Sequence, residues 1–179
     1  MGVNLIAALW GFAESTLFFI VPDLWSSIVG RDKLRRGLIA CLYSVAGSLA
    51  GGSIVYFWGS LDLTGATFVL EKTLAVSAEM VTRVHEELND LGEWAILFGP
   101  LRGTPYKLYA AQAANAGINL FSFLLISIPA RLVRFIAVTT FCHYALQALK
   151  RLGLRVNSLT ILLTAWTLFY LAFFLVMPN

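Results

Sequence analysis

Hydrophobic residues in this 179-residue chain gather into long runs separated by short polar segments. Three runs, at 37–58, 119–149 and 156–177, are long enough to cross the roughly 30 Å hydrocarbon core of a bilayer as helices. The pattern therefore predicts three transmembrane helices. Residues 37–58 also carry small residues at intervals of four, a spacing that lets helix backbones approach closely. We favour tight packing within the chain over a homo-oligomer contact as its explanation.

Charged and apolar residues alternate with the helical period over residues 70–91. The apolar positions, among them Val81, Val84 and Leu88, form one stripe, and the charged positions cover the rest of the surface. This pattern predicts one amphipathic helix that lies on the membrane surface or caps the domain.

Two further apolar segments, residues 1–30 and 93–118, are interrupted by prolines: Pro22 in the first, Pro100 and Pro105 in the second. Neither half of residues 93–118 is long enough to cross a bilayer. Irregular backbone at membrane depth is tolerated only where protein buries it or where it lines a cavity. We therefore predict two re-entrant hairpins with turns at these prolines. An ordinary transmembrane helix is the alternative for the first apolar run.

Loop charge orients these elements. The basic clusters at residues 31–36 and 150–155 are predicted to be cytoplasmic. The first hairpin then enters from the cytoplasm and the second from outside, each followed by a transmembrane helix. Inverted repeats of broken helices are a recurring plan of transporters with a site near the membrane midplane. The predicted fold is thus an all-α integral membrane protein, a single domain over residues 1–179 with two opposed re-entrant hairpins.

Composition supports the membrane class, because 59% of the residues are hydrophobic and only 13% are charged. The net charge of +3 is spread over loops and membrane sites, so we expect no nucleic-acid partner. Cys41 and Cys142 lie in apolar segments and are interpreted as packing residues, and we expect neither a metal nor a cofactor. With two histidines and no hydrolase motif, the sequence predicts a protein that is not an enzyme.

Arg131 and Arg134 lie within a long apolar run, where one cation costs roughly 2.5–3.5 kcal/mol at the bilayer centre. Their spacing of three residues places both on one side of a helix, so they must face protein, water or an anion. Six ionisable residues at membrane depth are candidates for a substrate or proton pathway: Glu14, Asp23, Arg102, Lys107, Arg131 and Arg134. Static ion pairs that fix the fold are the alternative. The surplus of cations favours binding of an anion such as a lipid phosphate.

The stretches at residues 12–23 (FAESTLFFIVPD) and 104–107 (TPYK) resemble the DedA family, which carries the VTT or SNARE-associated domain. The glycine- and serine-rich run ending in YFWG at 56–59 and the ARLVRF stretch at 130–135 are similar to the same pattern. The resemblance covers roughly residues 5–145 and looks strongest to the YqaA-like branch.

This resemblance implies two facing re-entrant hairpins and the movement of phospholipids or polyprenyl-phosphate carriers in bacteria. The family's acidic residue in the first hairpin falls on Glu14 and Asp23. Its basic residue after a proline falls on Lys107, and its helix arginines fall on Arg131 and Arg134.

One departure concerns the second hairpin. The common pattern has an Arg-Phe pair before the proline and an arginine after it, whereas here Arg102 precedes Pro105 and a lysine follows. Lysine binds phosphate as a point charge and lacks the bidentate fork of arginine. This departure therefore bears on the identity of the substrate more than on the fold.

The sequence thus predicts a lipid transporter or scramblase of the bacterial inner membrane that acts on the phosphate headgroups of membrane lipids. Protonation of Glu14 or Asp23 would couple passage to a proton gradient if coupling exists. A proton-coupled exporter of small solutes or cations is one alternative. A membrane scaffold that binds a partner through the amphipathic helix is another.

Overall fold

The computed structural model describes residues 2–152 and 157–176, and every regular element in them is helical. Three helices are long and apolar enough to cross a membrane: α3 (Leu34–Leu61), α8 (Leu120–Arg151) and α9 (Ser158–Val176). The predicted all-helical class and its three long apolar helices are confirmed. The predicted bounds of the last helix, residues 156 and 177, lie outside the described residues. Such helices fit a membrane protein.

The small residues of α3 receive the backbone of α1 (Gly2–Glu14). A β-carbon at Gly47 would come within 1.8 Å of the Ala8 carbonyl oxygen, and one at Gly11 within 2.1 Å of the Ser44 carbonyl oxygen. The Ser44 hydroxyl also donates a hydrogen bond to the Ala7 carbonyl. Tight packing within the chain therefore explains this small-residue face, as predicted.

The first apolar segment forms two helices, α1 and α2 (Asp23–Gly30), separated by a bend over residues 15–22. We call this the first broken segment. The hydroxyls of Ser15 and Thr16 donate to carbonyls in the last turn of α1 and compete with the backbone there. The helix ends at Glu14, so residues 3–21 do not form one continuous helix.

The second broken segment, residues 93–118, contains α6 (Glu93–Phe98), the 3-10 turn η1 (Gly99–Arg102) and α7 (Tyr106–Ala113). Gly103 ends η1 with φ of +92°, a conformation that glycine adopts without strain. Pro105 then precedes α7 and cannot donate a backbone hydrogen bond. The two prolines thus lie in the break between two short helices, and re-entry of this segment into a membrane stays a prediction.

The prediction of a single helix over residues 70–91 is wrong. The chain forms α4 (Leu63–Glu71) and α5 (Ala78–Leu91), with Ala75 at φ of +65° between them. The Ser77 hydroxyl caps α5 by accepting a hydrogen bond from the Met80 N–H, which starts a new helix at this point. The amphipathic character of α5 is confirmed, because its apolar stripe is buried.

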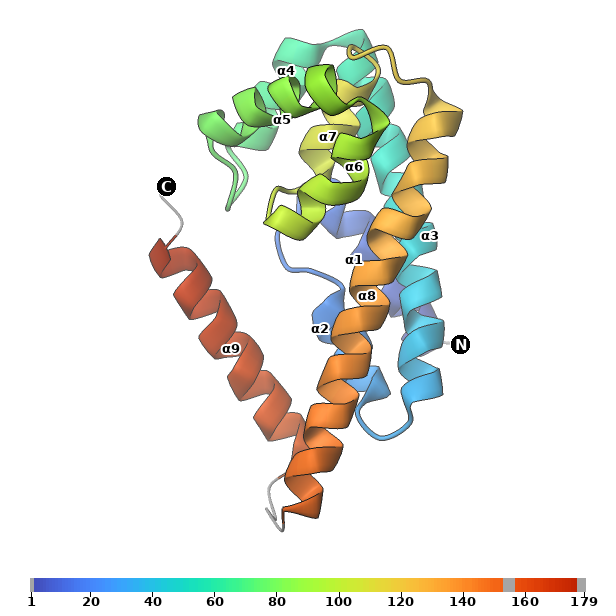
Figure 1. Cartoon of the computed structure of the whole chain (residues 1–179), viewed down its shortest axis with the longest axis vertical. Helices are drawn as coiled ribbons and strands as arrows, with labels where there is room; N and C mark the ends of the chain where they lie inside the picture. Colours follow the sequence, from blue (N-terminus) through green and yellow to red (C-terminus); the bar gives the residue numbers. More distant parts are fainter. Residues whose placement is uncertain (1, 153–156, 177–179) are drawn as a thin grey trace.

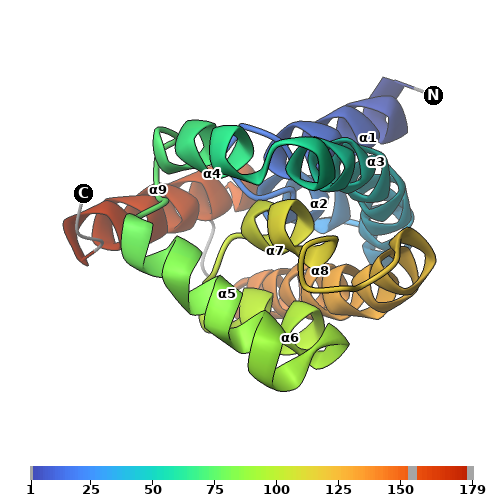
Figure 2. The same ribbon diagram turned by 90° about the horizontal axis from the view of Figure 1, so that it is seen from above.

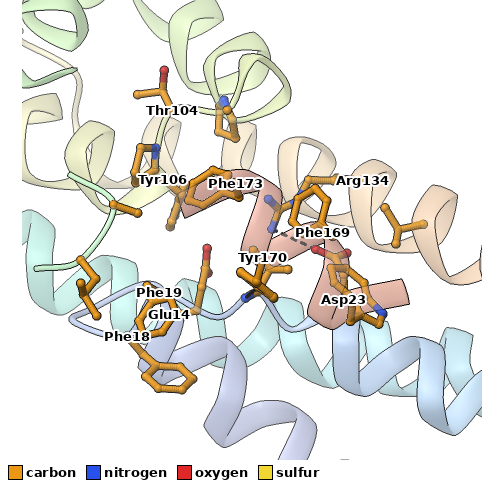
Figure 3. Close-up of a pocket in the computed structure, with 18 of the residues that line it drawn as sticks. Glu14, Phe18, Phe19, Asp23, Thr104, Tyr106, Arg134, Phe169, Tyr170 and Phe173 are labelled. Carbon is orange, nitrogen blue, oxygen red and sulfur yellow. Dashed lines mark hydrogen bonds and ion pairs between the residues drawn. The ribbon is translucent and has the colours of Figure 1, made fainter. Parts of the chain in front are cut away.

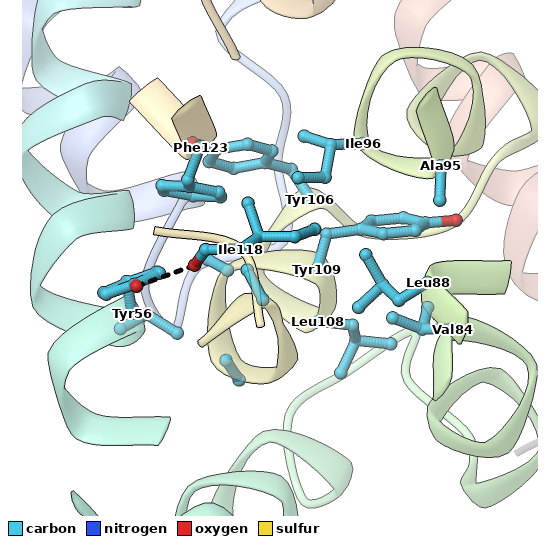
Figure 4. Close-up of a cluster of buried hydrophobic side chains, with 14 of the residues drawn as sticks. Tyr56, Val84, Leu88, Ala95, Ile96, Tyr106, Leu108, Tyr109, Ile118 and Phe123 are labelled. Atoms are coloured by element: carbon cyan, nitrogen blue, oxygen red, sulfur yellow. Dashed lines mark hydrogen bonds between the residues drawn. The ribbon is translucent and has the colours of Figure 1, made fainter. Parts of the chain in front are cut away.

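The helices gather around α3 and α8, which pack against each other (Figure 1). Helices α4 to α7 lie together near one end of this pair, and α9 leaves the far end of α8 at an angle (Figures 1 and 2). A buried cluster links α7 to its neighbours and includes Leu88, Ile96, Tyr109 and Phe123 (Figure 4). The Tyr56 hydroxyl donates to the Ile118 carbonyl at 2.8 Å and ties α3 to this cluster.

Candidate functional site

Arg131 of α8 and Glu14 at the end of α1 form a buried ion pair. Both terminal nitrogens of Arg131 donate to the two carboxylate oxygens of Glu14, one of them over 3.2 Å, and one also donates to the Ser48 hydroxyl at 3.1 Å. The guanidinium stacks over the rings of Tyr106 and Phe135, 4.7 and 4.9 Å from their centroids. Since Arg131 is only 1% exposed, its charge is compensated almost entirely by Glu14.

Arg134 and Asp23 form a second, looser pair one helical turn away (Figure 3). The nearest nitrogen of Arg134 lies 3.4 Å from one oxygen of Asp23. The Nε and this Nη2 of Arg134 have no hydrogen-bond partner within the described chain, and neither has the other oxygen of Asp23. Arg134 therefore keeps free donors while still balancing the buried carboxylate.

Lys107 brings a third cation to the same region. It lies in the first turn of α7, directly after the break at Pro105, and it is 3% exposed. Its ammonium donates to the Phe18 carbonyl at 3.5 Å, so the second broken segment reaches the first. Within the described residues it makes no ion pair with a carboxylate.

The three cations thus face two carboxylates, which leaves one surplus positive charge when all five groups are ionised. Such a surplus at a buried site is costly unless a further anion or water compensates it. A bound anion or water would therefore balance this region.

A cavity of about 470 Å³ opens beside these groups (Figure 3). Glu14, Asp23, Lys107 and Arg134 line its polar end. Both broken segments contribute residues of their breaks to the wall, including Phe18 and Val21 from the first and Pro100 and Pro105 from the second.

The remaining wall of the cavity is apolar. It includes Leu74 and Ala75 from the segment between α4 and α5, and Val138, Phe141 and Phe169 from α8 and α9. The cavity therefore combines ionised side chains with a largely apolar wall, a combination suited to an amphipathic ligand.

The structure brings five of the six predicted pathway residues together: Glu14, Asp23, Lys107, Arg131 and Arg134. It does not bring Arg102 into this group, because Gly103 turns the chain and the Arg102 side chain is 66% exposed. Pro22 immediately precedes α2 and is buried, whereas Pro100 and Pro105 line the cavity.

Arg102 instead belongs to a second polar contact. It lies 3.9 Å from Glu87 of α5, which also accepts a short hydrogen bond from the hydroxyl of Tyr109. Burial raises the pKa of Tyr109, so its hydroxyl remains protonated and donates to the carboxylate. This contact fastens α5 to the second broken segment.

Several residues of the site carry no clear signal in the sequence. Tyr170 and Trp166 lie in an unbroken apolar run, yet the Val21 N–H donates to the Tyr170 hydroxyl at 2.9 Å. The indole of Trp166 donates to the Ser27 hydroxyl at 3.1 Å. Their spacing of four residues, on one helix face, is the one pattern that could have pointed to a shared role.

Residues 2–152 and 157–176 contain no group of three or more His, Cys, Asp and Glu side chains that could hold a metal ion. The site described above therefore consists of ion pairs, free donors and an apolar wall.

No protein-family model matches the chain, and no solved structure matches it. Among curated proteins, the chain is similar to DNA polymerase subunit gamma-2 of Mus musculus, with 32% identity over 73 residues. That alignment covers 41% of this chain and 16% of the mouse protein. The chain thus spans less than a fifth of this relative, and the match does not show a family.

Proposed function

We propose that this protein moves lipids with anionic phosphate headgroups across the bacterial inner membrane, as a transporter or scramblase of the DedA family with its VTT domain. The cavity carries this proposal, because the cations Arg134 and Lys107 line it together with a largely apolar wall. A lipid offers the same two chemistries, an anionic headgroup and hydrocarbon chains.

The two broken segments act as opposed re-entrant hairpins in this proposal. Their helices α1, α2, α6 and α7 have 13, 8, 6 and 8 residues. At 1.5 Å per residue, the longest of them measures about 20 Å, short of the roughly 30 Å hydrocarbon core. The Lys107–Phe18 contact joins the two breaks beside the cavity, where irregular backbone is tolerated.

The headgroup binds through Arg134 and Lys107. The guanidinium of Arg134, whose Nε and Nη2 make no hydrogen bond within the described chain, supplies a planar fork for phosphate in exchange for its loose ion pair with Asp23, and Lys107 adds a point charge. A phosphodiester carries one negative charge, which matches the single surplus cation. Arg131 has a different role, because Glu14 and Ser48 already occupy its terminal nitrogens. In this proposal Arg131 therefore forms a structural ion pair, and Arg134 binds the ligand.

Reconstitution in liposomes tests the proposal. Labelled phospholipid or polyprenyl phosphate is placed in one leaflet, and its appearance in the other is measured. Wild-type protein should exchange the headgroups, and Arg134→Ala should slow exchange by about tenfold or more, since a charge-assisted bond contributes roughly 1.5–3 kcal/mol. Arg83→Ala, which removes an exposed cation of α5, is the matched control and should leave the rate unchanged. Headgroups that stay in their leaflet with wild-type protein would contradict the proposal.

A proton-coupled exporter of small solutes or cations is the second candidate. One observation favours it. Asp23 is buried, and one of its carboxylate oxygens has no hydrogen-bond partner within the described chain. The hydroxyl of Ser26, one turn later, also has none. Such a carboxylate can exchange a proton as its surroundings change. This candidate predicts that Asp23→Asn abolishes gradient-dependent solute uptake while lipid movement is unaffected.

A further inference from the structure

Helix α9 is attached to the rest of the molecule along one side. Two side-chain hydrogen bonds hold it, from the Val21 N–H to Tyr170 and from Trp166 to Ser27. Both partners belong to the first broken segment, and α9 packs against α2. The opposite side of α9 is exposed, as at Leu168, Leu171 and Leu175. Separating α9 from the first broken segment therefore breaks these two hydrogen bonds and the aromatic contacts of Phe19 with Tyr170 and Phe174.

Both α8 and α9 contribute apolar residues to the cavity wall, Phe141 from α8 and Leu162, Ala165 and Phe169 from α9. We call this apolar half of the wall the seam between α8 and α9. The aromatic side chains of α9 lie beside Arg134 and Asp23 (Figure 3). An anion bound at Arg134 would therefore have an apolar surface directly next to it.

We propose that this seam between α8 and α9 binds the hydrocarbon chain of the lipid, and that α9 is the movable wall that admits the chain from the bilayer. The proposal rests on the proposed function. Charge complementarity identifies the occupant, because the cations Lys107 and Arg134 hold a headgroup whose chain must then extend along the apolar walls. Opening requires the two hydrogen bonds to Tyr170 and Trp166 to break, while α1, α3 and α8 stay in place.

Filling the seam is the first test. Ala165→Trp places an indole in the apolar half, whereas Leu171→Trp places the same side chain on the opposite, exposed side of α9. In proteoliposomes with fluorescent phospholipid, Ala165→Trp should slow lipid exchange about tenfold or more, because an overfilled site excludes the chain. Leu171→Trp should keep the wild-type rate. An Ala165→Trp protein that matches wild type would overturn the proposal.

Locking the seam is the second test and is independent of folding. Ser27→Cys and Trp166→Cys are combined with Cys41→Ala and Cys142→Ala, and the two new thiols are bridged by a short crosslinker that reduction removes. The bridged protein should exchange lipid about tenfold more slowly than the same sample after reduction, since α9 cannot leave α2. Equal rates before and after reduction would overturn the inference and leave the proposed function standing. Absence of exchange in wild-type protein would contradict the proposed function itself.

Discussion

Arg131 and Arg134 are three residues apart and face the same region, yet their surroundings differ. Arg131 is enclosed by Glu14, Ser48 and two aromatic rings, whereas Arg134 keeps free donors at the cavity. Their position in an apolar run predicts that both face the interior. Their division of roles depends on where α1 ends, which no local pattern encodes.

The two ion pairs should differ in their contribution to stability. Glu14→Gln leaves the Arg131 charge buried without compensation, and breaking such a pair costs about 3–5 kcal/mol. Asp23→Asn leaves Arg134 at the cavity wall, where water can solvate it, so the loss should be smaller. Thermal unfolding in detergent, followed by tryptophan fluorescence, measures both.

The thermal stabilities of Glu14→Gln and Asp23→Asn show whether the Arg131–Glu14 and Arg134–Asp23 pairs differ in their contribution to the fold. An Asp23→Asn protein that loses as much thermal stability as Glu14→Gln would show that both pairs are structural. The cavity would then lack the free cation on which headgroup binding depends.

At the scale of elements, the sequence predicts long helices and their breaks more accurately than the ends of surface helices. A long apolar run must form a helix at membrane depth because its backbone groups need partners, and prolines interrupt the shorter runs. The stop between α4 and α5 was missed because Ala75 and Ser77 lie within a nearly continuous helical period. The outward direction of Arg102 was missed because it depends on the positive φ of Gly103.

The contact between α1 and α3 gives a prediction at this scale. Gly47→Val should destabilise the protein strongly, because even a β-carbon at this position would meet the Ala8 carbonyl at 1.8 Å. Ala46→Val, on the exposed side of the same turn, is the control and should have little effect. The yield of monodisperse protein and its thermal midpoint report the difference. Equal behaviour of the two variants would show that α1 does not pack on α3 this closely.

The whole molecule is proposed to be an inverted repeat, in which two broken segments meet at a cavity between α8 and α9. Three long apolar helices support a membrane location, and the short helices of the broken segments support re-entry. In this proposal the cations Arg134 and Lys107 lie at membrane depth, where they meet an anionic headgroup.

Cysteine accessibility tests the proposed topology. In a Cys41→Ala, Cys142→Ala background, single cysteines at Gly2, Lys33, Glu93 and Phe121 are labelled with a membrane-impermeant maleimide. Re-entry predicts that the cysteines at residues 2 and 33 react from one side, because a hairpin returns to the face that it entered. Those at 93 and 121 should react from the other side. Labelling of residues 2 and 33 from opposite sides would show that the first broken segment spans the membrane.

The central claim is that the cavity holds the phosphate headgroup of a lipid, and headgroup photocrosslinking tests it most directly. Phospholipid with a photoreactive headgroup is incorporated into proteoliposomes, irradiated, and the crosslinked peptides are identified by mass spectrometry. The account predicts crosslinks to the residues around Lys107 and Arg134, and their loss when Arg134→Ala and Lys107→Ala are combined. Crosslinks that are confined to α5 and that do not change with these substitutions would contradict the account.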